Sequence, residues 1–376
     1  MNIISDIWNY AWPFLVTISV IVFVHELGHY LVARANGVRV EVFSIGFGPE
    51  LFGVRDRHGT RWKLSLLPLG GYVKFFGDAN AASGAKDGQT LAALGDEDRR
   101  VSFHHKRVGQ RAAVVLGGPL GNFVFAAIVF AFLFGTIGEP KLSDGADVGG
   151  VVSGQPAQAA GLLAGDKVLS VNGQPVVLFE DLQRVIQQSA GAPLAMTVLR
   201  GESELQLTVT PQRREERDEQ GNPRDAWRIG VERAVVFTPV GPARGIWLAI
   251  EQTYSVAYET LRAVGQMISG ARSTEELGGP IQIGKMSGDI AQEGSFRKLI
   301  YFLAVLSINL GLINLFPVPM LDGGHLIFYI WEAIAGRPLK PRVQEYGMRV
   351  GFVLVIALMV WVTSKDLIRI GLLDLF

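Results

Sequence analysis

Two histidines and a glutamate lie close together near the end of a long apolar segment, in the pentapeptide HELGH. His25 and His29 are four residues apart, so in a helix their imidazoles share one face and can both reach a single metal ion. Glu26 lies beside them and can take a proton as water attacks a carbonyl, because zinc lowers the pKa of a bound water to about 7. This spacing therefore predicts metal-dependent hydrolysis.

A catalytic zinc site has three protein ligands and leaves its fourth position for water. The chain has no cysteine, so a metal must rest on histidine and carboxylate ligands. The best candidate for the third ligand is Asp322, in the segment NLFPVPMLDGGH. Pro317 and Pro319 must end or distort a helix there, and the glycines after Asp322 permit unusual backbone torsions. Irregular backbone at membrane depth is tolerated only where it is buried in protein or lines a water-filled cavity.

Long apolar segments must position these residues. Of the 376 residues, 49% are hydrophobic and only 19% are charged, which favours a membrane protein. About 20 predominantly apolar residues are needed to cross a bilayer. We assign four transmembrane helices, to residues 1–35, 111–138, 298–324 and 346–370. The first has no basic residue at its start, as a cleaved signal peptide would, so we interpret it as a retained span.

The depth of the candidate ligands follows from the lengths of their segments. The 18 uncharged residues from Ile7 to Val24 rise about 27 Å as a helix, which brings His25 close to the far side of a core about 30 Å thick. The third segment crosses in the same direction, and its 23 uncharged residues bring Asp322 to a similar level. We therefore expect the ligands to meet near one face of the membrane.

The basic residues predict which face this is, because lysine and arginine concentrate on the cytoplasmic side. They crowd the first and third connections, whereas the N-terminus has none and only Lys141 follows the second span closely. Both termini and the long middle connection are therefore expected outside the cytoplasm, with the active site near the cytoplasmic face. The formal net charge of zero gives no indication of a nucleic-acid partner.

Two connections contain further structure. In the first, residues 36–110, the stretch 41–77 alternates apolar and polar residues between glycines and prolines, which predicts a membrane-associated β-hairpin region. An ordinary interfacial loop is the alternative. The stretch 78–100 is small and polar and predicts a flexible insertion. In the middle connection, residues 240–297 contain apolar side chains at helical intervals, which predicts a helix that either lies on the membrane surface or packs only on protein.

The middle connection is also long enough to hold a domain. Residues 147–235 predict strands, a helix opening near Pro156, a second helix at 179–188 and two further strands that meet at a turn around Arg200. The arrangement resembles a PDZ domain, most specifically through AGLLAGDKVLSVNGQPV. We therefore expect one inserted PDZ-like domain, a β-sandwich with helices.

Together, HELGH, NLFPVPMLDGG and the PDZ-like segment resemble the site-2 protease family, of the bacterial regulator-of-sigma-E protease type. The resemblance covers nearly the whole chain and includes GFGPELFG, GGPLGN and LGGPIQI, at residues 46–53, 117–122 and 277–283. It implies an α-helical protein of the bacterial inner membrane. The chain departs from the best-known form because it has one PDZ-like domain instead of two.

The resemblance also implies roles for individual residues. His25, His29 and Asp322 correspond to the zinc ligands, Glu26 to the general base and Asn314 to a group that helps hold the substrate backbone. It further implies single-span membrane proteins as substrates, such as anti-sigma factors already trimmed outside by another protease, with the PDZ-like domain excluding untrimmed ones. Because the carbonyls of a transmembrane helix are locked in internal hydrogen bonds, a substrate must unwind, and GFGPELFG is a candidate edge for strand addition.

Two other classes of function use the same features. A non-enzymatic membrane scaffold would use the PDZ-like domain to bind chain termini, but it leaves Glu26 and Asp322 unexplained. A metal transporter would use the histidines and the aspartate as a transit site. Such a protein usually has polar residues along several spans, which the second and fourth segments lack.

Overall fold

The computed structural model describes residues 3–78, 94–217, 223–274 and 278–369. It divides into two compact units, one formed by Met1–Phe134 with Pro242–Phe376 and the other by Gly135–Gly241. Most of the expected flexible insertion, residues 79–93, lies outside the described residues. The end of that stretch is helical, because α3 covers Asp96–Val101.

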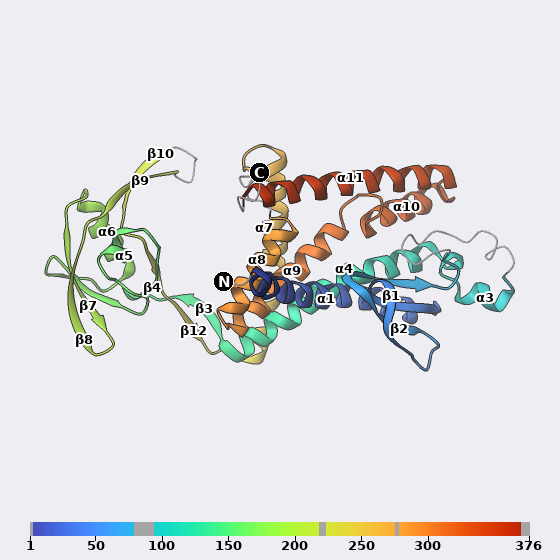
Figure 1. Cartoon of the computed structure of the whole chain (residues 1–376), viewed down its shortest axis with the longest axis horizontal. Coiled ribbons are helices and arrows are strands. Elements are labelled where there is room, and N and C mark those ends of the chain that lie inside the picture. The colour runs from blue at the N-terminus through green and yellow to red at the C-terminus, as the bar shows by residue number, and fades with distance from the viewer. Residues whose placement is uncertain (1–2, 79–93, 218–222, 275–277, 370–376) are drawn as a thin grey trace. The chain divides into compact units, whose positions relative to one another are not determined.

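The larger unit is mainly helical (Figure 1). Four helices in the described part of the chain are long and apolar enough to cross a membrane, as the sequence predicts: Trp8–Ala35 within α1, and the whole of α4, α9 and α11. Beside α3, the helices of this unit are α1 (Ile3–Ala35), the 3-10 turn η1 (Phe103–His105), α4 (Val108–Ile137), α7 (Pro242–Ile268), α8 (Pro280–Gln292), α9 (Phe296–Asn314), α10 (Asp322–Ala335) and α11 (Pro341–Arg369).

The third apolar segment differs from the expected span at its end. Helix α9 stops at Asn314, and a separate helix, α10, begins at Asp322. Pro317 and Pro319 lie between the two helices, and each disfavours helical backbone at the residue before it. The sequence predicted the interruption, but the helix that follows it was not foreseen. Asp322 is therefore the first residue of a helix, at the end of an irregular loop.

Helices α1 and α4 approach closely through glycines. A Cβ atom on Gly117 would lie 2.7 Å from the carbonyl oxygen of Gly28, and one on Gly121 would lie 3.0 Å from the carbonyl oxygen of Val24. Any larger residue would push the helices apart, and small residues commonly allow such contact between membrane helices. The motif GGPLGN thus brings α4 directly against the helix that carries HELGH.

Strands β1 (Val40–Arg55) and β2 (Arg61–Phe75) pair antiparallel beside α1, but each folds back on itself. Residues 42–45 pair with 71–74 on one side and with 61–64 on the other, and residues 50–55 pair with 61–65. The resulting segment order is 50–55, 61–65, 40–45 and 71–75. The two edges are therefore formed by residues 50–55 and 71–75.

The outer part of this hairpin exposes large apolar side chains. Figure 1 shows the two strands, drawn in blue, beside the C-terminal half of α1. The exposed group comprises Leu51, Phe52, Val54, Leu64, Leu66 and Leu67. These six side chains are therefore not covered by the described part of the chain.

Helix α7 has two different faces. Thr260 donates a hydrogen bond to Asn309 of α9 at 3.0 Å, and Gln252 donates one to Tyr301 of α9 at 3.3 Å. The apolar residues that predicted an amphipathic helix, Ile246, Ile250, Tyr254 and Leu261, are exposed. The described residues therefore leave this apolar face of α7 largely uncovered, and whether it meets the membrane surface stays a prediction.

The smaller unit is a β-rich domain. Strands β5–β8 form an antiparallel sheet of order β6-β5-β7-β8, and three further pairs join β4 to β11, β3 to β12 and β9 to β10. Its elements are β3 (Glu139–Leu142), β4 (Val148–Val151), α5 (Pro156–Ala159), β5 (Lys167–Val171), β6 (Gln174–Pro175), α6 (Phe179–Gln188), β7 (Leu194–Arg200), β8 (Ser203–Val209), β9 (Gln212–Arg217), β10 (Pro223–Arg228), β11 (Val231–Arg233) and β12 (Val235–Thr238).

Local sequence determines much of this unit. Asn172 and Gly173 have φ of 49° and 75°, the left-handed pair that a tight hairpin turn between β5 and β6 requires. The second helix expected from the sequence, residues 179–188, coincides with α6. Its buried face packs into one apolar core with the sheet, made of Val168, Val171, Phe179, Leu182, Ile186, Leu194, Met196 and Val198 among others. The compact unit is wider than the expected 147–235, because β3 and β12 belong to it.

Candidate metal centre

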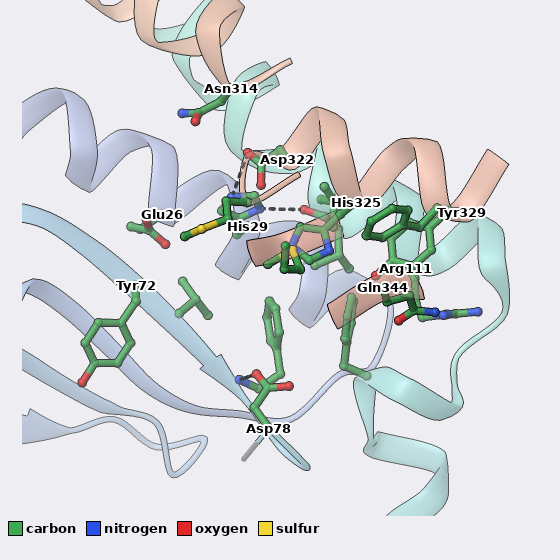
Figure 2. Close-up of a pocket in the computed structure, with 18 of the residues that line it drawn as sticks. Glu26, His29, Tyr72, Asp78, Arg111, Asn314, Asp322, His325, Tyr329 and Gln344 are labelled. Carbon is green, nitrogen blue, oxygen red and sulfur yellow. Dashed lines mark hydrogen bonds and ion pairs between the residues drawn. The ribbon is translucent and has the colours of Figure 1, made fainter. Parts of the chain in front are cut away.

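Three candidate ligand atoms converge at the junction of α1 and α10. The Nε2 atoms of His25 and His29 lie 3.2 Å apart, and they lie 3.2 and 3.5 Å from Oδ2 of Asp322. In a tetrahedral site with bonds of about 2.0–2.1 Å, ligand atoms are separated by about 3.3 Å. The triangle therefore has the size that a zinc ion needs (Figure 2).

The hydrogen bonds around this triangle also fit a metal. Nδ1 of His29 donates to the carbonyl oxygen of Val114 at 2.9 Å, which leaves the lone pair of Nε2 for a cation. Oδ2 of Asp322 is buried and makes no hydrogen bond to the described residues, although two imidazole nitrogens face it. When Nε2 of both histidines is unprotonated, two lone pairs and a carboxylate oxygen point at one spot, and a cation between them removes their mutual repulsion. The donor set is thus suited to zinc.

Glu26 lies at the same site, on the side facing the β-hairpin (Figure 2). A Cβ atom on Gly71 would lie 3.1 Å from Cγ of Glu26 and 2.7 Å from the carbonyl oxygen of Ser44. The edge segment 71–75 therefore runs directly beside this carboxylate. Only Phe47 of the segment GFGPELFG lines the pocket, whereas residues 70–73 all do. The end of GFGPELFG thus belongs to the other edge, residues 50–55, and the edge near the site is segment 71–75, because the strands bend back on themselves.

Asn314 is the last residue of α9 and lines the same pocket as the candidate ligands. The pocket has a volume of about 1190 Å³. Figure 2 shows Asn314 on the opposite side of Asp322 from His325 and Tyr329. Its carboxamide can therefore meet a chain that passes the candidate metal ligands. The structure brings all five site residues expected from the sequence to one cavity.

A buried ion pair fixes the helix that begins with Asp322. Nη2 of Arg111 donates to Oε1 of Glu332 at 2.6 Å, and the side chains are only 8% and 16% exposed. The guanidinium also lies 4.9 Å from the ring centre of Tyr329. These contacts join α10 to the start of α4, and removing one partner of a buried pair typically costs several kcal/mol (about 3–5). Arg111 and Glu332 are 221 residues apart, so the spacing of residues along the chain could not predict their ion pair.

The β-hairpin is fastened to α1 through Asp56. Oδ2 of this carboxylate accepts hydrogen bonds from Tyr30 and Trp62, both at 3.0 Å, and Oδ1 accepts from the backbone of His58 and Thr60. Burial would raise the pKa of Asp56, but the bonds from Trp62, Thr60 and Tyr30 outweigh it and lower the pKa from 3.8 to about 2. The stabilisation is therefore complete above pH 3.8 and is lost only as pH falls towards about 2.

Gly118 allows α4 to lie against the two histidines. A Cβ atom there would lie 2.6 Å from Cε1 of His29 and 2.8 Å from Cε1 of His25. We expect Gly118→Ala to displace at least one ring and to lower zinc affinity by roughly 10–100-fold, the range for disturbed outer-shell support. Competition with a chelator measures this effect. Gly135→Ala, in the same helix but facing open space, is the matched control and should leave zinc affinity unchanged.

Several bacterial proteins are similar to this chain over most of its length. A protein of Mesorhizobium japonicum named "Putative zinc metalloprotease" is 42% identical, over 94% of this chain and 97% of its own length. A protein of Rhizobium meliloti with the same description is 40% identical, over 98% and 99%. "Metalloprotease MmpA" of Caulobacter vibrioides is 35% identical, over 94% of both chains.

Solved structures similar to part of the chain include PDZ domains. The PDZ domain of an SdrC-like protein from Listeria monocytogenes is 21% identical, covers 25% of this chain and 90% of its own, and has a TM-score of 0.19. The PDZ domain of HtrA3, solved with a phage-derived ligand, is 27% identical, covers 23% and 66%, and has a TM-score of 0.17.

The family comparison covers almost all of the chain. The family model described as Peptidase family M50 matches residues 13–358, a range that includes every candidate ligand. The relatives cover nearly the full length of this chain at 35% identity or more, and their names describe metalloproteases. The chain therefore belongs to peptidase family M50, a family of zinc-dependent metalloproteases that act on protein substrates.

Proposed function

We propose that this zinc metalloprotease cleaves peptide bonds in or beside the transmembrane segments of single-span membrane proteins. One observation carries the proposal: a pocket containing Glu26 and a zinc-sized triangle of ligand atoms lies among helices apolar enough to cross a bilayer. Polar side chains at membrane depth are costly unless they are paired or functional. A water-accessible pocket at this depth is what hydrolysis within a membrane requires.

Each residue has a task in the reaction. His25, His29 and Asp322 would hold zinc, which when bound polarises a carbonyl and makes water a strong nucleophile. Glu26 accepts a proton from the attacking water and returns it to the leaving amine. Asn314 donates a hydrogen bond to the substrate backbone near the scissile bond. The chain thus supplies the general base and the positioning groups for one peptide hydrolysis.

The substrate binds in an extended form along the edge segment 71–75. In the described part of the chain, this edge pairs as a strand with residues 40–45 on one side only, so backbone groups on its outer side can bond an added strand. Its position beside Glu26 favours it over the edge formed by residues 50–55. An added strand satisfies the backbone groups that an unwound transmembrane helix releases. Side chains are then recognised only loosely.

Anti-sigma factors already trimmed by another protease fit this substrate class, and the PDZ-like unit excludes untrimmed chains. Cleavage of a single-span reporter substrate by the purified protein, together with its zinc content, tests the proposed function. We expect about one zinc per chain and cleavage that a chelator abolishes and zinc restores. Zinc without cleavage would favour a transporter, and the absence of both would favour a scaffold.

The PDZ-like unit can be removed without touching the proposed site. Strands β3 and β12 pair from Glu139 with Thr238, so the chain enters and leaves the unit at one place. We expect deletion of residues 139–238, with a short Gly-Ser linker, to preserve cleavage of a trimmed substrate and to permit cleavage of an untrimmed one. Gel analysis of both substrates measures the change in selectivity.

A matched control for this deletion carries Glu26→Gln as well, so that any remaining cleavage is attributed to the same site. If the deletion variant bound zinc but cut neither substrate, the unit would be part of the catalytic machinery and the proposed filter would be wrong.

We further propose that the protein resides in the bacterial inner membrane with its termini and PDZ-like unit outside the cytoplasm. The basic residues of the first and third connections support this orientation. A reporter fused within residues 79–100 should score cytoplasmic, and one within residues 202–225 should score external. The opposite pattern would place the active site at the other face of the membrane.

A further inference from the structure

Asn122 is a buried polar residue to which the proposed reaction assigns no task. It lies in α4 with no exposed surface, four residues after Gly118, on the face turned towards the histidines. Its Nδ2 lies 3.2 Å from Nδ1 of His25, while its Oδ1 is buried without any hydrogen-bond partner among the described residues. A buried carboxamide oxygen without a hydrogen-bond donor is unfavourable. In this orientation, Oδ1 of Asn122 is such an oxygen.

The two histidines differ in the group that meets Nδ1. For His29 that group is the carbonyl oxygen of Val114, which can only accept, so Nδ1 carries the proton and Nε2 has the free lone pair. Among the described residues, Nδ1 of His25 has its hydrogen-bond contact with the carboxamide of Asn122. If Nδ2 of Asn122 donated to His25, the proton would sit on Nε2, where a metal ligand needs its lone pair.

The two ends of a carboxamide have nearly the same shape, so a half-turn exchanges them without moving the helix. We propose that Asn122 is a positioning residue whose oxygen accepts the Nδ1 proton of His25 and thereby presents the Nε2 lone pair to zinc. The inference rests on the proposed metal site. Asn122 would accept the Nδ1 proton of His25 as the backbone carbonyl of Val114 accepts that of His29.

The surroundings hold Asn122 in place. Ser307 of α9 donates a hydrogen bond to its backbone oxygen at 3.1 Å, and a Cβ atom on Gly311 would lie 3.3 Å from its Cβ atom. Helix α9 thus holds the base of the side chain, and only the carboxamide can turn. This rigidity is what an outer-shell group needs in order to orient a ligand.

Three variants of the full chain test the proposal. Asn122→Leu keeps the branched shape but has no acceptor, and Asn122→Asp keeps acceptors in the same place but has no donor. Asn309→Leu is the matched control, because Asn309 is a polar residue of a membrane-crossing helix that bonds Thr260, away from the metal. Zinc affinity by chelator competition and the absorption spectrum of the cobalt-substituted protein are measured beside peptide cleavage.

We expect Asn122→Leu to weaken zinc binding roughly 10–100-fold and to alter the cobalt spectrum, while Asn122→Asp stays within about threefold of the parent. Asn309→Leu should match the parent. The proposal is wrong if Asn122→Leu binds zinc as tightly as the parent, or if Asn122→Asp loses tenfold or more. Because the aspartate variant alone separates acceptor from donor, it decides the question even if Asn122→Leu does not fold.

These results are distinguishable from a failure of the proposed function. A parent protein without stoichiometric zinc would refute the metal site itself. A parent that binds zinc, with no difference among the variants, would refute only the role of Asn122.

Discussion

Asp322→Ala is expected to lose zinc and proteolysis together. The substitution removes one of three converging ligand atoms and leaves two imidazoles that cannot complete a site on their own. Zinc affinity should fall by more than the roughly 10–100-fold that loss of an outer-shell partner causes. Metal analysis after gel filtration, with cleavage measured on the same sample, checks both effects.

The variant should still enter the membrane, because replacing a carboxylate by a methyl group does not hinder partitioning into an apolar phase. Asp289→Ala is a matched control, since this acidic residue lies in α8 outside the pocket lining and should leave zinc unchanged. If Asp322→Ala bound zinc as tightly as the parent and cut substrate, the third ligand would lie elsewhere. The proposed partnership of α1 and α10 around one metal would then be refuted.

Glu26→Gln is expected to keep zinc and lose nearly all cleavage. Glutamine has almost the same size and hydrogen-bonding reach as glutamate, but it cannot accept the proton of the attacking water. General-base catalysis typically contributes about 10²–10⁴-fold, so kcat should fall by at least about 100-fold. Zinc content close to that of the parent, measured on the same preparation, separates this result from the loss of a ligand.

Glu41→Gln is the control for charge removal, because Glu41 forms an ion pair with Lys74 in the hairpin and does not line the pocket. It should retain both zinc and cleavage. Substantial activity in Glu26→Gln would mean that another group takes the proton, and the assignment of the general base would have to change.

The features that depend on spacing along the chain were accessible from the sequence. His25 and His29 share a helix face because they are four residues apart, and the four candidate spans follow from unbroken apolar runs. The helix predicted at residues 179–188 of the PDZ-like segment coincides with α6. Asp322 stood out because proline and glycine interrupt the apolar segment around it.

Contacts between distant segments were not accessible in this way. Arg111 and Glu332 are separated by 221 positions, and the sequence around each residue does not indicate that they form an ion pair. The sequence offered GFGPELFG as a candidate edge for strand addition, but it gave no sign that the strands fold back and bring residues 71–75 beside Glu26. The register of strands that bend in this way depends on their packing against α1. That packing cannot be read from the alternation of apolar and polar residues within one strand.

The sequence by itself therefore determined the chemistry that this protein can perform, because the ligand types, their helical spacing and their apolar setting are local properties. The tertiary structure alone decided how that chemistry is supported. Gly118 and Asn122 reach the histidines only because α4 packs against α1 through glycines. Such contacts arise from the close fit of helices far apart in sequence, so they appear only once the chain is folded.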